Sequence, residues 1–329
     1  MIWLQFLISA AVIVAASMFL ARYADAIALR TGLGRMFIGA LLLSSVTSLP
    51  EILTTIQAFS QGVPNLAAGN LVGSNMFNMA LLALADLAGR DRRVLRSVAH
   101  RHALTGSLTL MMIALAIFFL VADIDVQVGW VGLDSIVLIL AYIGGVRLLQ
   151  AQSRAVAREQ QDEVIPEGVP PLGRAIIGFI LAAAVLTVIS PVLVSSSSAI
   201  AEVTGLGTSF VGLTLVALVT SLPEVVTTTQ LVRDGAEDMA VGNLFGSNMF
   251  NMFAIGLVDF FYLPGRFLGV IESSFVLVGM IGLIMTALGL IGNLARIERR
   301  LWFIEIDALL MLVLYFGGLW LLYVRGITF

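Results

Sequence analysis

The sequence predicts an all-α integral membrane protein with about ten transmembrane helices in two inverted-topology five-helix repeats. Hydrophobic residues make up 59% of the 329 residues and charged residues 12%, and the mean hydropathy is +1.02. This composition is typical of membrane proteins rather than soluble ones. The apolar runs are long and numerous enough to cross a bilayer about ten times. A pattern of polar residues and glycines recurs at an offset of 173 positions, which indicates a duplicated unit.

The expected spans form two groups of five. They run approximately over 2–20, 36–59, 64–88, 103–121 and 128–149, and then over 174–194, 208–232, 239–263, 275–294 and 303–324. The stretch between the groups is rich in Arg, Glu, Asp and Pro. We therefore expect a first transmembrane repeat over residues 1–150, a linker over 151–173 and a second transmembrane repeat over 174–329.

The arginines predict the orientation. In this scheme all 18 arginines except Arg266 and Arg325 fall on the side of the membrane that holds the linker. By the positive-inside rule that side is cytoplasmic, so the N-terminus is outside. We expect a multi-pass protein of the plasma membrane, which is the inner membrane in a bacterium. The chain starts without a positive segment or a small-residue cleavage site, as a first span does and a removed signal peptide does not.

Two motifs carry the repeat. Residues 46–51 and 219–224 both read V-T-S-L-P-E, and residues 69–79 and 242–252 share G-N-L-x-G-S-N-M-F-N-M. Each half has an odd number of expected spans, so the second half enters the membrane from the opposite side. Transporters built in this way place their substrate site near the midplane, where interrupted helices of the two halves meet.

The first motif places Glu51 and Glu224 in the middle of apolar spans. An ionisable residue there costs roughly 2.5–3.5 kcal/mol on insertion scales and is a functional-site candidate by default. Pro50 and Pro223 each free a backbone carbonyl one turn earlier. A carboxylate beside hydroxyls and free carbonyls suits a hard cation such as Ca²⁺ or Na⁺. A single copy could be a plain helix kink, but two matched copies favour an ion site.

Polar residues near both motifs share helical faces, with spacings of three, four and seven residues. Facing one another across the pseudo-two-fold axis, four such stripes would surround the two carboxylates with oxygen atoms. The predicted metal-ligating residues are Glu51, Glu224, Thr47, Thr220, Ser48, Ser221, Ser74, Ser247, Asn78, Asn251, Ser44 and Ala217. Any one Ser or Asn could instead join helices by hydrogen bonds.

The remaining polar residues are expected outside this site. Asp86 and Asp259 are interpreted as anchors at the membrane faces, and His100 and His102 as residues of a charged loop. The solvated charges of the outer loops are expected to be Asp123, Asp125 and Glu202. There is no cysteine and no lysine, which excludes thiolate metal sites and Schiff-base chemistry.

Charge predicts the mechanism. Two ionised glutamates carry a charge of about −2, which one Ca²⁺, two Na⁺ or two protons would neutralise. Such a site cannot be left bare in a low dielectric. If the site opens to each side of the membrane in turn and must always hold a cation, it can release one cation only by binding another. The protein would then exchange cations across the membrane.

The paired motifs resemble the two α-repeats of the sodium/calcium exchanger family, prokaryotic type, within the cation/calcium antiporter superfamily. The resemblance covers about residues 31–86 and 204–259 and implies calcium:sodium antiport. It implies that Glu51 and Glu224 are the central Ca²⁺-binding glutamates, which also face sodium. It implies that Thr47 and Thr220 contribute oxygens to the Ca²⁺ site.

The resemblance also assigns roles to the remaining predicted residues. Hydroxyls that line the flanking sodium sites match Ser48, Ser221, Ser74 and Ser247. The polar position one turn later matches Asn78 and Asn251, and a backbone carbonyl offered to sodium matches Ser44 and Ala217. Asn251 stands where some members, including potassium-dependent ones, have Asp, which argues against potassium dependence.

Three alternatives stay open. Protons could be the counter-ion, because the same glutamates could be protonated. An intramembrane protease would need a nucleophile–base pair or two catalytic aspartates, and the mid-span acids are both Glu, so we expect no enzyme. A passive channel usually repeats its selectivity filter around an oligomer axis, whereas the repeat of this sequence lies within one chain and is inverted. The expected partners are Ca²⁺, Na⁺ or H⁺ as substrates and the lipid bilayer, with no cofactor, no nucleic acid and no obligate protein partner.

Overall fold

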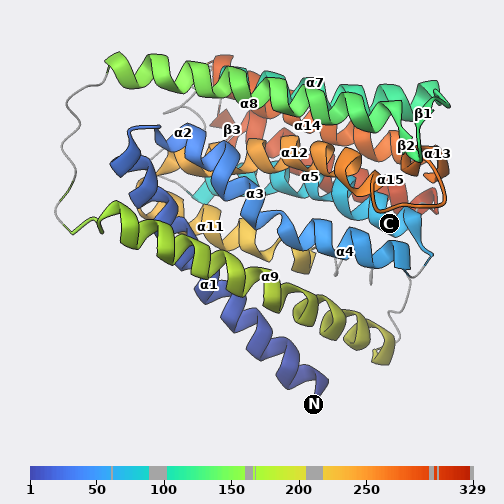
Figure 1. Ribbon diagram of the computed structural model, residues 1–329, viewed down its shortest axis with the longest axis horizontal. Coiled ribbons are helices and arrows are strands. Elements are labelled where there is room, and N and C mark those ends of the chain that lie inside the picture. The colour runs from blue at the N-terminus through green and yellow to red at the C-terminus, as the bar shows by residue number, and fades with distance from the viewer. Residues whose placement is uncertain are drawn as a thin grey trace.

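The computed structural model describes residues 1–60, 62–88, 102–159, 166, 168–204, 218–295, 300–301 and 304–326. Over these residues the chain is almost entirely helical, which confirms the all-α class (Figure 1). The long helices are α1 (Ile2–Thr31), α5 (Pro64–Ala88), α7 (Ala103–Ala122), α8 (Leu133–Glu159), α9 (Leu172–Val203), α12 (Glu237–Asp259), α14 (Phe275–Ala295) and α15 (Ile306–Val324).

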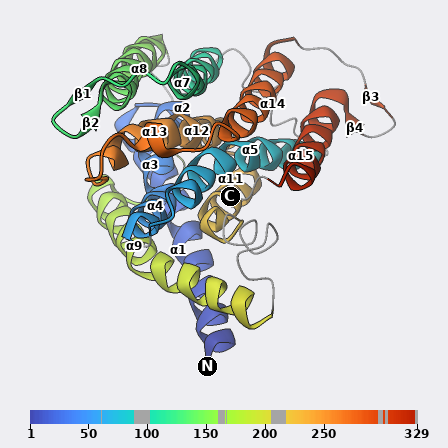
Figure 2. The same ribbon diagram turned by 90° about the vertical axis from the view of Figure 1, so that its right-hand side faces the viewer.

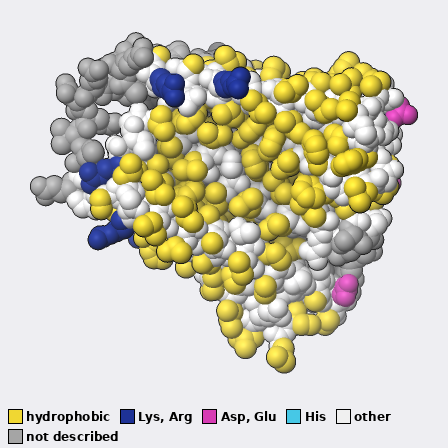
Figure 3. Space-filling view, viewed as in Figure 1, with side chains coloured by type: hydrophobic (Ala, Val, Ile, Leu, Met, Phe, Trp, Pro, Cys, Tyr) yellow, Lys and Arg dark blue, Asp and Glu magenta, His cyan; other side chains and the backbone are white. Residues whose placement is uncertain are grey.

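Eight helical spans of the described chain are long and apolar enough to cross a membrane. The two other expected spans are the polar, glycine-containing α5 and the span over 208–232, of which residues 208–217 lie outside the described residues. Apolar side chains cover the face seen in Figure 3. Arginines lie at the end where α8 connects to α9, and acidic side chains lie at the opposite end. This is the charge distribution of a membrane-spanning bundle.

The span with the first V-T-S-L-P-E motif is interrupted. It consists of α2 (Arg35–Phe37), the π-helical η1 (Ile38–Leu43), α3 (Ser44–Thr47) and α4 (Leu49–Ser60). Ser48 leaves helical geometry, with φ −89° and ψ 8°.

The second copy breaks in the same way. Ser221, just before α11 (Leu222–Arg233), has φ −85° and ψ 10°. In each copy a proline follows two residues later and has no backbone N–H to bond the carbonyl four residues earlier. Both spans therefore break at the serine, and the motif glutamate stands in the first turn of the next helix.

Three helices are longer than the predicted spans. α1 continues to Thr31, α8 to Glu159, and α9 begins at Leu172 and reaches Val203. The extensions of α1 and α8 contain several good helix formers, Ala and Arg among them, whereas that of α9 includes four consecutive serines. A polar residue in the extension of α1 is paired, because Asp25 binds Arg35 at 2.5 Å. Hydropathy marks where an apolar run ends, whereas the backbone hydrogen bonds continue beyond it.

α12 lies at the centre of the bundle, against α5, α7, α8, α11 and the first interrupted span (Figure 2). Its backbone touches that span directly. A Cβ added to Gly242 would lie 2.7 Å from the carbonyl oxygen of Met36, and one added to Gly246 would overlap the backbone of Ala40. The absence of side chains at these glycines allows this close approach, which presses the second repeat against the broken helix of the first.

The repeat extends to the membrane ends. The hairpin of β1 (Gln127–Val128) and β2 (Val131–Gly132) has a counterpart in β3 (Arg300–Leu301) and β4 (Ile304–Glu305). Each strand of the second hairpin begins 173 positions after its counterpart, with the same antiparallel register. An aspartate stands in the first turn of the helix that follows each hairpin. The duplicated unit is therefore longer than the two motifs.

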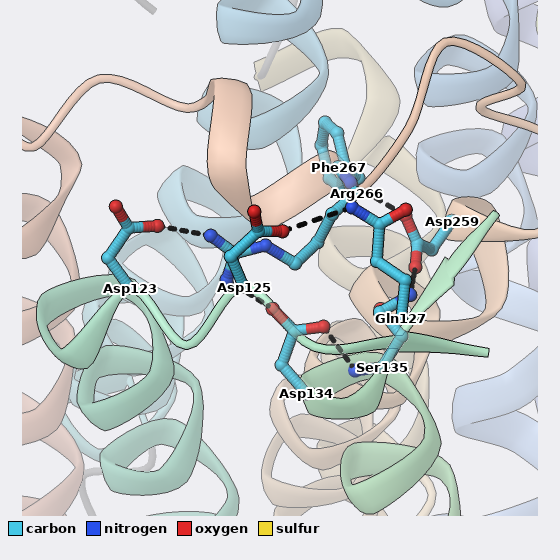
Figure 4. A network of polar contacts seen from close by, with 9 residues as sticks. Asp123, Asp125, Gln127, Asp134, Ser135, Asp259, Arg266 and Phe267 are labelled. Atoms are coloured by element: carbon cyan, nitrogen blue, oxygen red, sulfur yellow. Dashed lines mark hydrogen bonds and ion pairs between the residues drawn. The ribbon is translucent and has the colours of Figure 1, made fainter.

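A buried arginine ties together the membrane end beside β1 and β2 (Figure 4). Arg266 lies between α12 and α13 (Phe267–Val270) and donates to Asp134 at 3.0 Å and also to Asp123. Burial disfavours the charged guanidinium, but the hydrogen bonds and charges of these aspartates outweigh burial and raise the pKa of Arg266. Asp123 is exposed, as expected of a loop charge, but it is also an ion-pair partner. We call these three residues the Arg266 cluster.

Asp259 was expected to anchor the protein at a membrane face. It lies at one membrane end of the bundle, as expected, but its carboxylate binds protein backbone and does not face the interface. The residue is fully buried. Its carboxylate accepts the backbone N–H of Gly132 at 2.8 Å and that of Phe267 at 2.6 Å, so it joins the end of α12 to β2 and to the start of α13.

His102 directly precedes α7, as expected of a residue at the end of a loop, but it does not face solvent. It is buried at the start of α7, and its Nε2 lies 3.2 Å from Oδ1 of Asp238 in the first turn of α12. His100 lies outside the described residues. The position that corresponds to Asp238 in the first half is Asn65, which donates to Glu272 at 2.8 Å.

Candidate ion-binding site

Glu51 and Glu224 lie in the interior of the bundle, each 1% exposed. They occupy the first turns of α4 and α11, where the helix dipole favours a negative charge. Within the described part of the chain neither glutamate has an ion-pair partner. A cation or a proton is therefore needed to balance them.

Each glutamate is served by a serine of the other repeat. Ser221 donates to Oε1 of Glu51 at 3.1 Å, and Ser48 donates to Oε1 of Glu224 at 3.2 Å. Both serines stand at the helix breaks. The two breaks therefore face each other. Each serine binds the glutamate of the other repeat, so the two contacts cross between the repeats.

The serines of the second motif add further oxygens. Ser74 Oγ lies 3.5 Å from Ser221 Oγ, and Ser247 Oγ lies 3.5 Å from Thr47 Oγ1. All four residues are buried. Each contact again joins the second motif of one repeat to the first motif of the other, so the hydroxyls gather around the carboxylates.

Four asparagines on α5 and α12 form a second layer, which we call the amide bracket: Asn75, Asn78, Asn248 and Asn251. Asn78 donates to Oδ1 of Asn248 at 2.9 Å, and Asn251 donates to Oδ1 of Asn75 at 3.2 Å. Asn248 also donates to the backbone carbonyl of Asn75 at 3.2 Å. The first two bonds are related by the repeat, so the bracket crosses the pseudo-axis between the two central helices.

Four buried oxygens of these groups have no hydrogen-bond partner among the described residues. They are Oε2 of Glu51, Oε2 of Glu224, Oδ1 of Asn78 and Oδ1 of Asn251. The repeat relates the two carboxylate oxygens to each other and the two amide oxygens to each other. Buried acceptors without partners are costly, and a hard cation would satisfy several of them at once.

Two predicted residues are placed differently from the rest. Ser44 is buried, and its hydroxyl donates to the carbonyl of Ala40 at 2.8 Å, while its own carbonyl accepts the hydroxyl of Thr47 at 3.3 Å. Ser44 can therefore offer a backbone oxygen rather than its hydroxyl. Ala217 lies outside the described residues.

Sequence reasoning missed four asparagines of the second motif. Asn70 and Asn243 bind the threonines of the first motif, and Asn75 and Asn248 belong to the amide bracket. Asn70 could have been found, because it precedes Ser74 by four residues and so shares its helical face. Asn75 and Asn248 precede Asn78 and Asn251 by three residues, so spacing could have included them, but their bonds across the repeats depend on how α5 and α12 pack.

A comparison with family models decides the family. The model described as sodium/calcium exchanger protein matches residues 1–149 and 174–324. The chain belongs to the sodium/calcium exchanger protein family. This confirms the resemblance inferred from the two doubled motifs.

Relatives from bacteria and archaea match much of the chain. Putative antiporter CaxA of Alkalimonas amylolytica is 28% identical over 305 residues, which cover 91% of this chain and 92% of the relative. Inner membrane protein YrbG of Escherichia coli (strain K12) is 30% identical over 253 residues, 74% of this chain and 75% of the relative. Sodium/calcium exchanger MaX1 of Methanosarcina acetivorans is 26% identical over 292 residues, 76% of this chain and 80% of the relative.

Solved structures of the sodium-calcium exchanger NCX_Mj share the fold. The structure soaked with 10 mM Na⁺ and zero Ca²⁺ matches with a TM-score of 0.70 at 22% identity, covering 97% of this chain and 98% of that one. The structure soaked with 2.5 mM Na⁺ and 0.1 mM Sr²⁺ matches with a TM-score of 0.69. The chain is thus a multi-pass membrane protein with the fold of an exchanger.

Proposed function

We propose that the protein is a secondary-active antiporter that exports Ca²⁺ in exchange for Na⁺ by alternating access. Glu51 and Glu224 would bind the two ions competitively. The observation that carries this proposal is the set of four unpartnered oxygens, two on carboxylates and two on amides, in two pairs related by the repeat. Oxygen ligands of these kinds suit Ca²⁺ and Na⁺.

The charge of the site supports exchange rather than passive flow. The two glutamates carry about −2 when both are ionised, and they are buried without an ion-pair partner in the described structure. One Ca²⁺ or two Na⁺ would neutralise this charge, whereas the bare site would be very costly at membrane depth. The site would therefore change its exposure from one side to the other only while loaded, which couples the two ion fluxes.

The hydroxyls and amides around the carboxylates complete the proposed ligand set. Besides the two glutamates, these are Thr47, Thr220, Ser48, Ser221, Ser74, Ser247, Asn78 and Asn251. The proposed set also includes the backbone carbonyls of Ser44 and of Ala217, which lies outside the described residues. The relative MaX1 is named a sodium/calcium exchanger. In this proposal the same ions are the substrates of this chain, which acts as a transporter and not as an enzyme.

The proposed orientation follows the arginines. The halves 1–150 and 174–329 would lie in the plasma membrane, with the N-terminus outside and the linker between the halves in the cytoplasm. Arginines near the α8–α9 connection and acidic side chains at the other end support this (Figure 3). An inward Na⁺ gradient would then drive Ca²⁺ out of the cell.

A proton counter-ion is the second candidate, and one observation favours it. In both glutamates Oε1 is held by a serine, whereas Oε2 has no partner. A proton on Oε2 would neutralise each carboxylate and leave the serine contact intact. The same site could then exchange Ca²⁺ for H⁺.

Transport by purified protein in liposomes tests the proposal. Vesicles loaded with Na⁺ are diluted into Na⁺-free buffer, and ⁴⁵Ca²⁺ uptake is followed with and without an imposed pH gradient. We expect uptake that needs internal Na⁺ and ignores the pH gradient. Glu51→Gln and Glu224→Gln should abolish it, because one remaining charge cannot neutralise Ca²⁺. The matched control is Glu202→Gln, which removes an exposed glutamate at the end of α9 and should transport normally.

Each outcome assigns the mechanism. Uptake that follows the pH gradient without Na⁺ would transfer the assignment to a calcium:proton antiporter. Uptake that needs no counter-ion would indicate a channel. Full activity in either glutamine variant would refute the two-carboxylate site, whatever the counter-ion.

A further inference from the structure

A hydroxyl that binds a cation must point its proton elsewhere. A threonine or serine hydroxyl has one donor hydrogen and two acceptor lone pairs. In a buried site that hydrogen needs an acceptor that the cation does not use. Ser48 and Ser221 donate hydrogen bonds to Oε1 of the glutamates. Side-chain amides lie within hydrogen-bond distance of Thr220 and Thr47, and the hydroxyl of Thr47 also has the backbone carbonyl of Ser44 in reach.

Asn70 is the acceptor for Thr220. Thr220 Oγ1 donates to Oδ1 of Asn70 at 3.2 Å, and Asn70 Nδ2 donates to the backbone carbonyl of Glu51 at 2.9 Å. A backbone carbonyl can only accept, so the amide must turn its NH₂ toward Glu51 and its oxygen toward Thr220. Asn70 is 4% exposed. One side chain thus joins a threonine of the second repeat to the backbone of a glutamate of the first.

Asn243 is the repeat-related acceptor, but it is held less firmly. Thr47 Oγ1 lies 3.4 Å from Oδ1 of Asn243 and 3.3 Å from the carbonyl oxygen of Ser44, so two acceptors compete for its one hydrogen. Asn243 Nδ2 donates to Oγ1 of Thr227 at 3.4 Å. The hydroxyl of Thr227 donates to the carbonyl of Pro223 at 2.8 Å, so its oxygen can accept a hydrogen bond from the amide of Asn243. Both bonds of Asn243 are longer than those of Asn70, and the second depends on a hydroxyl that can rotate.

We propose that Asn70 and Asn243 are positioning residues for ion binding. Each accepts a hydrogen bond from a threonine of the other repeat, so that the lone pairs of Thr220 and Thr47 face the cation; for Thr47 the carbonyl of Ser44 shares this task with Asn243. The inference rests on the proposed function and adds to it two residues that act through the threonines. Asn70 contributes more than Asn243, because its amide is fixed by a backbone carbonyl.

A double-mutant cycle on purified, reconstituted protein tests this. The readouts are the KM for Ca²⁺, the maximal uptake rate per folded protein, and the amount of folded protein. Asn70→Leu removes the acceptor with little change in size, and Thr220→Val removes the hydroxyl. We expect each to raise the KM about five- to tenfold, as the loss of one buried hydrogen bond would. The double variant should be no worse than the worse single variant, because both changes break one contact.

Asn65→Leu is the matched control. It removes an amide from the same helix, but at the membrane end, where Asn65 binds Glu272 at 2.8 Å. Its KM should equal that of the unmodified protein. A general effect of amide loss on α5 would raise the KM in both asparagine variants and would contradict the inference.

The remaining outcomes are distinct. If the two KM effects multiply in the double variant, Asn70 does not act through Thr220 and the inference is overturned. A lower yield of folded Asn70→Leu with an unchanged KM would assign it a purely structural role. If Asn70→Leu yields no folded protein, Asn243→Leu with Thr47→Val provides the cycle, with a rise of about two- to fivefold expected. Failure of Na⁺-driven uptake in the unmodified protein would refute the proposed function instead.

Discussion

At the midplane the two repeats make the same contact twice, since Ser221 donates to Glu51 at 3.1 Å and Ser48 donates to Glu224 at 3.2 Å. At the starts of α5 and α12 equivalent positions differ. Asn65 binds Glu272 at one end, whereas the residue in its place at the other end binds the buried His102.

This difference teaches where the duplication is constrained. A cation on the pseudo-axis would contact both repeats at once, so neither repeat could change its oxygens without altering the site. The two membrane ends face different solutions and are far from the axis. Their contacts need to hold helices together, and any pair of suitable strength can do that. We therefore expect substitutions at the membrane ends to affect stability. Equivalent substitutions in the two repeats at the midplane should affect transport to the same extent.

The largest expected effect is on stability, in Arg266→Gln. Loss of the guanidinium leaves Asp134 buried and without its ion-pair partner, which costs about 3–5 kcal/mol. Thermal unfolding of the purified protein in detergent measures this. Arg325→Gln, which removes an exposed arginine at the end of α15, is the control and should unfold like the unmodified protein. The KM for Ca²⁺ should stay unchanged in both, and a raised KM in Arg266→Gln would break the separation of the two regions.

The next effect is expected at the contact between repeats. In Gly246→Ala the new methyl group would overlap the backbone of Ala40, and overpacking of this kind costs about 1–3 kcal/mol. Gly144→Ala is the matched change, because nothing lies within 4 Å of a Cβ there. It should be neutral or stabilise α8 by up to about 1 kcal/mol. Equal unfolding temperatures for the two variants would contradict the close approach of α12 to η1.

The comparison is sharpened by Ser48→Ala and Ser221→Ala. Each removes one hydrogen bond to a glutamate of the other repeat, and each should raise the KM for Ca²⁺ about fivefold. Because the two distances are nearly equal, the two rises should agree within about threefold. A large rise in one variant and none in the other would show that the repeats are not equivalent at the ion site.

The smallest effect is expected at the helix starts. His102→Asn removes a buried contact to Asp238 and should cost about 1 kcal/mol in detergent unfolding. Asn65→Ala breaks a contact to Glu272 that is accessible to solvent, and water can replace it, so the cost should be smaller. A larger loss of stability in Asn65→Ala than in His102→Asn would mean that the solvent-accessible contact contributes more to the free energy of unfolding than the buried one.

Local sequence patterns predicted much of the fold and the central residues of the candidate ion site. Hydropathy predicted the helical spans, and the doubled motifs predicted which glutamates share a site. The burial of Asp259 and His102 was not predicted, because a polar or charged residue near the end of an apolar run has the same pattern whether it faces solvent or a buried partner. Asn75 and Asn248 were missed because their bonds join the two repeats and depend on the packing of α5 on α12.

The sequence by itself determined that the chain is a membrane protein, that it is duplicated, and that two prolines interrupt two helices beside Glu51 and Glu224. These properties depend on composition, on an offset and on the missing N–H of proline, all of which are local. Only the tertiary structure decided that Ser221 donates a hydrogen bond to Glu51 and that Asn70 accepts one from Thr220. Such pairings join residues about 150 to 170 positions apart, and the packing of one repeat on the other selects them.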